Sequence, residues 1–130
     1  KDAFQLGGSL EKPEAIIAVA SICADSKEDA EFIAASHTYW KVQAFRHGAR
    51  DALFSPEEVM DKKKQLSLSD QAYYDETLAT MVTGTPEQCQ SRLEQIADLY
   101  KVDELMIVNV THAFEPRISS YKMLAKQFGL

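Results

Sequence analysis

Apolar runs along the chain alternate with segments in which apolar residues recur every three or four positions. The first run, residues 15–24, is almost unbroken and does not alternate, which predicts a strand buried on both faces of a parallel sheet. Asp25 and Ser26 can then cap a helix, and the spacing of apolar residues up to Gly48 predicts that this helix is long and amphipathic. Its expected inner stripe consists of Ala30, Ile33, Ala34, His37, Trp40 and Ala44. Residues 1–13 are polar and glycine-bearing, and we interpret them as a linker.

Residues 49–79 have a different character. Ser55 and Pro56 form a strong helix start, because a capping hydroxyl precedes a proline in the first turn. Ser69 and Asp70 are expected to begin a second short helix. We interpret this stretch as a helical excursion inserted between regular elements.

Regular alternation then returns. Residues 80–83 predict a short strand, Thr85 and Pro86 open a helix, residues 105–110 predict another strand, and a last helix covers 114–128. The resulting order, β-α-insert-β-α-β-α, predicts an α/β fold with parallel strands. Three parallel strands leave two edges unpaired. The periodicity is therefore compatible with a small flavodoxin-like sheet and with a piece of an eight-stranded barrel.

Composition narrows the class of protein. The 130 residues suffice for one domain, and their apolar share of 45% predicts a sizeable core. The formal net charge of −6 argues against nucleic acid and anionic membranes as partners, because phosphate binding needs clustered cations. No apolar run reaches the roughly 20 residues of a membrane span. The two cysteines, Cys23 and Cys89, lack zinc-site spacing and are expected to be reduced core residues of a cytoplasmic protein.

Four segments carry a family resemblance. They are a strand-to-helix joint at 24–30 reading ADSKEDA, a turn at 84–87 reading GTPE, a strand at 103–108 reading DELMIV, and an R-x-x-S-Y pattern from Arg117 to Tyr121. In this order they resemble the C-terminal portion of luciferase-like, flavin-dependent monooxygenases. The resemblance covers about residues 13–130. It implies that residues 14–130 are three β/α units of a (β/α)8 TIM-type barrel, an incomplete fragment whose first half is absent from this chain, with 49–79 as an excursion over the active site.

The same resemblance implies a chemistry. Enzymes of this family use reduced flavin mononucleotide (FMN) and dioxygen to oxygenate an aldehyde, alkane, sulfonate or similar small organic substrate. A flavin reductase that supplies the reduced flavin and a homo-oligomeric assembly are the implied partners. Most flavin contacts in the family come from earlier strands, so the fragment alone is not expected to hold flavin or to turn over. The choice between FMN and a deazaflavin stays open, as do two alternatives: a non-catalytic α/β interaction or dimerisation module, and a flavin-free barrel relative.

Few residues are candidates for the chemistry. His112 follows the last strand and could donate a hydrogen bond to a reacting oxygen as a catalytic residue, or it could be an exposed loop histidine. Gly84 and Thr85 could bind the cofactor through backbone N–H groups, or they could only cap a helix. His37 is expected to be a core residue, and Arg117 to dock its helix or form an ion pair. No metal site is expected, because no histidine has ligand spacing to a cysteine or carboxylate.

Overall fold

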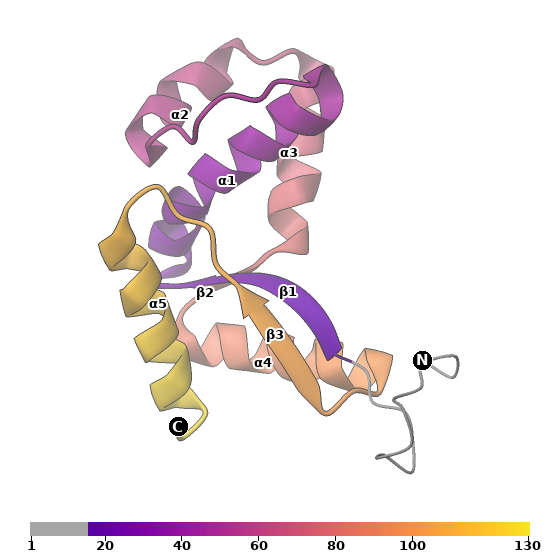
Figure 1. Cartoon of the computed structure of the whole chain (residues 1–130), viewed down its shortest axis with the longest axis vertical. Helices are drawn as coiled ribbons and strands as arrows, with labels where there is room; N and C mark the ends of the chain where they lie inside the picture. Colours follow the sequence, from indigo (N-terminus) through magenta and orange to yellow (C-terminus); the bar gives the residue numbers. More distant parts are fainter. Residues whose placement is uncertain (1–15) are drawn as a thin grey trace.

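The computed structural model describes residues 16–130, so the predicted linker at 1–13 lies outside the described residues. Figure 1 shows a sheet with helices packed on it and a group of helices extending away from it. The elements in chain order are β1 (Ile16–Cys23), α1 (Lys27–His47), α2 (Pro56–Lys62), a short 3-10 helix η1 (Lys63–Gln65), α3 (Leu68–Thr80), β2 (Val82–Gly84), α4 (Pro86–Tyr100), β3 (Glu104–Val108) and α5 (Phe114–Gln127).

The three strands form one parallel sheet in the order β2-β1-β3. Ser21 of β1 pairs with Val82 of β2, and Ile17 of β1 pairs with Leu105 of β3. The expectation of three units of a (β/α)8 barrel is therefore wrong. In a barrel each strand lies beside its neighbours in the chain, whereas here the first strand lies between the other two in an open sheet. This order matches the other alternative, a small doubly wound sheet of the flavodoxin-like type.

Helices cover both faces of the sheet, and alternate residues of β1 supply both cores. Val19 and Cys23 point toward α4 and α5, where they pack with Cys89, Leu93 and Leu124. Ile22 and Ala24 point the other way, where they pack with Ala30, Ala34 and Met81. The expected burial on both faces holds for Ser21–Cys23, but Ile16 at the start of the strand is 54% exposed.

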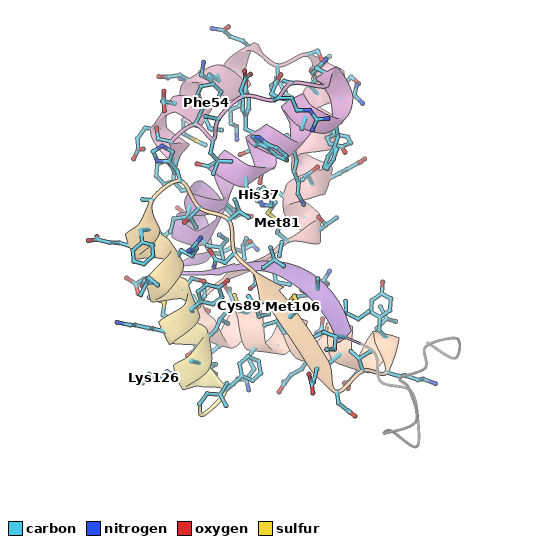
Figure 2. All side chains as sticks on the ribbon, in the orientation of Figure 1. His37, Phe54, Met81, Cys89, Met106 and Lys126 are labelled. Atoms are coloured by element: carbon cyan, nitrogen blue, oxygen red, sulfur yellow. The ribbon has the colours of Figure 1, made fainter. Side chains whose placement is uncertain are left out.

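The long helix α1 packs on the sheet with its first turns and against α2 and α3 with its later turns. Ser26 caps its first turn and Gly48, at φ 67°, ends it in the left-handed conformation, as the sequence predicts. Beyond the sheet, α1 packs against α2 and α3 through a core of Ala35, Val42, Val59 and Tyr74. Figure 2 shows Phe54 among these helices, His37 and Met81 where the helices meet the sheet, and Cys89 and Met106 in the sheet region.

A buried carboxylate joins α1 to α3. Asp70 accepts a hydrogen bond from Arg46 Nε at 2.6 Å and lies 2.7 Å from His47 Nε2. These two contacts, with His47 as the larger cause, hold the pKa of Asp70 below its usual range. The helix α3 begins earlier than predicted, because Ser67 rather than Ser69 caps it by accepting from the Asp70 N–H at 3.0 Å.

Candidate functional site

The carboxyl ends of the three parallel strands meet at one edge of the sheet. In a doubly wound sheet, ligands bind outside this edge, where the connections from two neighbouring strands run in opposite directions. Here the chain passes from β1 to β2, which lies on one side of β1 in the sheet. It then crosses over to β3, which lies on the other side of β1. The space outside the ends of β1 and β3 is therefore the place where a ligand site is expected.

A crevice of about 260 Å³ lies at this place. Three elements line it: the end of β1 and its following loop, the first two turns of α1, and the first three turns of α5. The lining residues are Cys23, Ala24, Asp25, Asp29, Phe32, Ile33, Pro116, Ser119 and Met123. Most of the lining is apolar, and the carboxylates of Asp25 and Asp29 are exposed beside it. We call this hollow the switch-point crevice.

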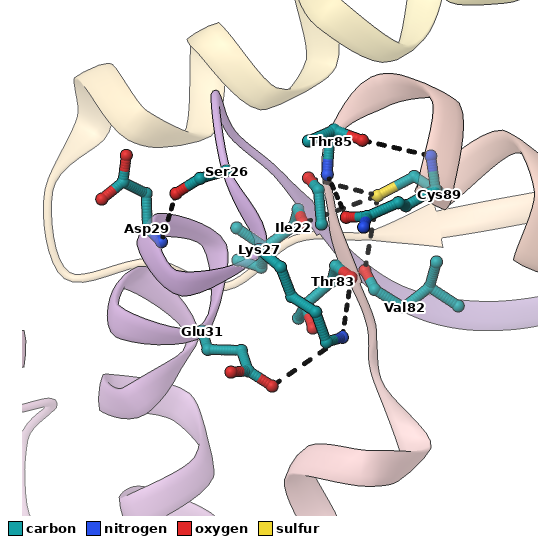
Figure 3. Close-up of polar contacts among 11 residues, drawn as sticks. Ile22, Ser26, Lys27, Asp29, Glu31, Val82, Thr83, Thr85 and Cys89 are labelled. Carbon is teal, nitrogen blue, oxygen red and sulfur yellow. Dashed lines mark hydrogen bonds and ion pairs between the residues drawn. The ribbon is translucent and has the colours of Figure 1, made fainter.

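The charges around the switch-point crevice are negative. Neither Asp25 nor Asp29 forms an ion pair with another residue of the described part of the chain. The nearby cation, Lys27, is directed elsewhere: its Nζ lies 3.4 Å from the Thr83 carbonyl oxygen and 3.8 Å from the Glu31 carboxylate (Figure 3). The crevice therefore suits a neutral or cationic group better than an anion.

A buried polar network fixes the same edge of the sheet. The Ser120 Oγ accepts hydrogen bonds from the Cys23 N–H at 2.8 Å and from the Asn109 Nδ2 at 3.0 Å. The Asn109 amide also donates to the Ser21 carbonyl at 3.0 Å, and the Ser21 hydroxyl donates to the Val82 carbonyl at 2.9 Å. The network connects β1, β2, the end of β3 and α5. It gives the serine of the R-x-x-S-Y pattern a structural role that the sequence alone does not disclose.

The predicted cofactor residues Gly84 and Thr85 form a capped helix start. Thr85 and Gln88 make a reciprocal capping box: the Gln88 N–H donates to Thr85 Oγ1 at 3.3 Å, and the Thr85 N–H donates to Gln88 Oε1 at 3.0 Å. Gly84 has φ 151°, and a Cβ added there would collide with the Gln88 side chain. Pro86 has no N–H to offer. The capping interpretation is confirmed, and the binding of a cofactor by these residues stays a prediction.

His112 lies in the exposed loop between β3 and α5. Its position is close enough to α2 that its charge helps to lower the pKa of Glu58, after the larger effect of the hydrogen bonds from Ser55. It does not line the switch-point crevice. None of the three predicted site residues, His112, Gly84 and Thr85, lines the switch-point crevice, and the catalytic role of His112 remains a prediction.

The two cysteines are free, buried thiols. Burial, together with the neighbouring Cys89, raises the pKa of Cys23 to about 12. Burial also raises the pKa of Cys89, whose Sγ lies 3.6 Å from the Gly84 carbonyl oxygen. Both side chains are therefore protonated and unreactive near neutral pH, as expected for core cysteines.

The other two residues singled out in the sequence, His37 and Arg117, have surroundings typical of structural residues. Burial, with a smaller contribution from Lys41, lowers the pKa of His37 to about 4, so this half-buried histidine is neutral at pH 7. Arg117 is exposed, with its guanidinium carbon 5.7 Å from the centre of the Phe114 ring. Within the described part of the chain, no three His, Cys, Asp or Glu side chains gather as a metal site, and no helix is long and apolar enough to cross a membrane.

The switch-point crevice meets only part of what a flavin phosphate needs. A phosphate needs clustered cations or free N–H groups at the point where it binds. The carboxylates of Asp25 and Asp29 lie at the crevice, and Ser26 caps the first turn of α1. The first turn of α5 also lines the crevice and has no side-chain cap. The described lining is therefore an apolar hollow with one uncapped helix start and without a cluster of cations.

No family model matches the chain. Three uncharacterized proteins of Bacillus subtilis (strain 168) are similar in sequence. YwcH is 31% identical over 90% of this chain, YvbT 29% over 96%, and YceB 27% over 98%. The aligned regions span 34%, 36% and 38% of these relatives, so the chain corresponds to little more than a third of their length.

A solved structure has the same fold as this chain. The crystal structure of apo-MsnO8 superposes with a TM-score of 0.79 at 22% identity, over 98% of this chain and 38% of MsnO8. This similarity concerns the arrangement of helices and strands only. In MsnO8, as in the three sequence relatives, the region that matches this chain is a minor part of a longer protein.

Proposed function

We propose that this chain is the C-terminal part of a longer, luciferase-like flavin-dependent monooxygenase. The observation that carries the proposal is the ordered set of four sequence segments, from ADSKEDA at 24–30 to the R-x-x-S-Y pattern at 117–121. Three of these segments fall at or beside the carboxyl edge of the sheet, where ligand sites of α/β proteins form. The similar proteins, little more than a third of whose length matches this chain, support the view that the active unit is larger than the chain.

The proposed reaction consumes reduced flavin, dioxygen and a small organic substrate. One oxygen atom enters the substrate, the other leaves as water, and the two electrons and two protons come from the reduced flavin, which is released oxidised. The cofactor supplies this chemistry, while the protein contributes binding, orientation and exclusion of water. In the cell, a flavin reductase would supply the reduced flavin, and we place the enzyme in the cytoplasm as a homo-oligomer.

The residues of this chain would contribute mainly to the substrate side. Phe32, Ile33 and Met123 give the switch-point crevice an apolar wall that can shield a small hydrocarbon group from water. Because Asp25 and Asp29 repel a phosphate, most of the flavin contacts are assigned to the part of the longer protein outside this chain. His112 remains a candidate for a hydrogen bond to a reacting oxygen, and Gly84 and Thr85 remain candidates for contacts with the cofactor.

The proposal is tested on the longer protein that contains this chain. FMN, a flavin reductase and reduced nicotinamide cofactor are supplied in air, and a panel of aldehydes, alkanes and alkyl sulfonates is screened for oxygenated products by mass spectrometry. We expect product with at least one substrate class, and a large loss of kcat/KM in Ile33→Trp, which fills the switch-point crevice. Phe45→Trp, on an exposed part of the same helix, is the control.

Two results would overturn the proposal. One is a longer protein that binds neither oxidised nor reduced flavin in equilibrium dialysis. The other is consumption of reduced flavin that never yields an oxygenated product with any substrate class. Turnover by residues 1–130 alone would contradict a narrower part of the proposal, which assigns the flavin contacts to the rest of the protein.

A further inference from the structure

A broad apolar groove runs along β3, between α4 and α5, on the side of the sheet opposite to α1. Its volume is about 790 Å³, three times that of the switch-point crevice. The lining residues are Leu93, Glu94, Ala97, Asp103, Glu104, Leu105, Ile107, Tyr121, Leu124, Ala125, Phe128 and Leu130. A groove of this size can accept several side chains of a docked segment, such as the apolar stripe of a short amphipathic helix.

The groove exists because no described helix of the chain is centred over β3. On this face α5 packs against β1, and α4 packs mainly against β2, so Leu105 and Ile107 remain partly exposed. The pairing of β3 is also one-sided, because among the described strands it pairs with β1 alone. Phe128 is 40% exposed at the far end of the groove. An apolar surface of this kind, next to an open strand edge, marks an interaction site.

Charge decides which partner the groove fits. Its rim carries three exposed carboxylates, those of Glu94, Asp103 and Glu104. Neither Glu94 nor Glu104 forms an ion pair with a described residue. We propose that the groove is a docking site for a cationic amphipathic helix of a partner protein. The apolar stripe of that helix would lie on Leu105 and Phe128, and its Lys or Arg residues would meet Glu94 and Glu104.

The same charges disfavour other occupants. An anionic lipid surface would be repelled by the carboxylate rim. A second copy of this chain, with its net charge of −6, would bring acidic surface against acidic surface. A cationic helix has neither problem, because it neutralises the rim while its apolar face covers the floor.

The probe is a synthetic helical peptide with leucines at i, i+3, i+4 and i+7 and lysines on both flanks, labelled for fluorescence anisotropy. Binding is measured with the 130-residue chain and with the longer protein that contains it. The test variants are Glu94→Gln/Glu104→Gln, which keeps the apolar floor, and Phe128→Ala, which keeps the charges. The matched control is Glu28→Gln/Glu57→Gln, which removes two exposed carboxylates away from the groove. Circular dichroism verifies that each variant is folded.

We expect Glu94→Gln/Glu104→Gln to weaken binding about tenfold at low ionic strength, with the difference shrinking as salt screens the charges. Phe128→Ala should also weaken binding, whereas the control double variant should bind like the parent chain. Equal losses in the control and the groove variants would overturn the proposal, as would equally tight binding of a peptide in which glutamates replace the lysines. Two other results would assign the groove to a different occupant and also overturn it: binding by the 130-residue chain but not by the longer protein, or a dimer in light scattering that Phe128→Ala dissociates.

Discussion

Replacing Ser120 with alanine tests the buried network that holds the carboxyl edge of the sheet together. The pairing of β1 with β3 extends only to Ala20 and Val108, so the Cys23 N–H lies beyond the last rung and donates to Ser120 Oγ instead. In Ser120→Ala this N–H keeps its burial but loses that acceptor, which costs about 1–3 kcal/mol. The Asn109 amide retains the Ser21 carbonyl, so its lost bond to Ser120 adds only about 0.5–1 kcal/mol. The free energy of unfolding should therefore fall by about 1.5–4 kcal/mol.

The assay is urea unfolding followed by circular dichroism. With a urea dependence of about 2 kcal/mol per molar for a domain of this size, the midpoint should fall by about 0.8–2 M with an unchanged slope. The matched control is Ser119→Ala, an exposed neighbour on the same helix that should change stability by less than about 0.5 kcal/mol. If the two variants unfold at the same urea concentration, the network does not stabilise the sheet edge and the reasoning is wrong.

Three further predictions concern other parts of the molecule. Asp70→Asn should lower the urea midpoint at pH 7. Because the folded-state pKa of Asp70 is depressed, the stability that its carboxylate contributes is present above the unfolded pKa of about 3.9 and is lost as pH falls through the folded pKa. The variant should therefore lose less stability than the parent chain on acidification. A parent and variant with parallel acid-unfolding curves would contradict this. Gly84→Ala should destabilise the folded chain by about 1–2 kcal/mol, because the added Cβ would displace the Gln88 cap. Gln88→Ala should then lower the free energy of unfolding less in the Gly84→Ala chain than in the parent chain, which a double-mutant cycle in urea can measure. Cys23 and Cys89 should resist a thiol reagent such as dithionitrobenzoate at neutral pH in the folded chain and both react in urea; fast labelling of the folded chain would refute their burial as protonated thiols.

Local sequence signals predicted most of the helices and their ends. Ser26 and Gly48 bound α1, and α2 begins at Ser55 and Pro56 as predicted, where Ser55 also forms a reciprocal capping box with Glu58. The errors also have local causes. Both Ser67 and Ser69 can cap α3, and the structure uses the earlier one. The strand predicted at 80–83 is Val82–Gly84, because Thr80 still belongs to α3, where its hydroxyl donates to the Thr77 carbonyl at 2.7 Å.

The order of the strands could not be predicted from periodicity. An apolar run shows that a strand is buried and parallel, but it does not identify the neighbouring strands. The family resemblance pointed to a barrel, whereas β1 lies between β2 and β3. The candidate site shares this difficulty. The switch-point crevice combines residues from Cys23 to Met123, so its lining depends on the strand order, and the only local signal for it was Asp25 directly after a buried strand.

The proposed function depends on the transfer of oxygen from dioxygen to an organic substrate, and isotopic labelling measures this transfer directly. The longer protein containing this chain is supplied with reduced FMN and the best substrate of the panel under an oxygen-18 atmosphere in ordinary water. We expect a product that carries a single oxygen-18 atom, with the other labelled atom recovered in water. A product without the label, or labelled only when the isotope is supplied as water, would contradict a monooxygenase.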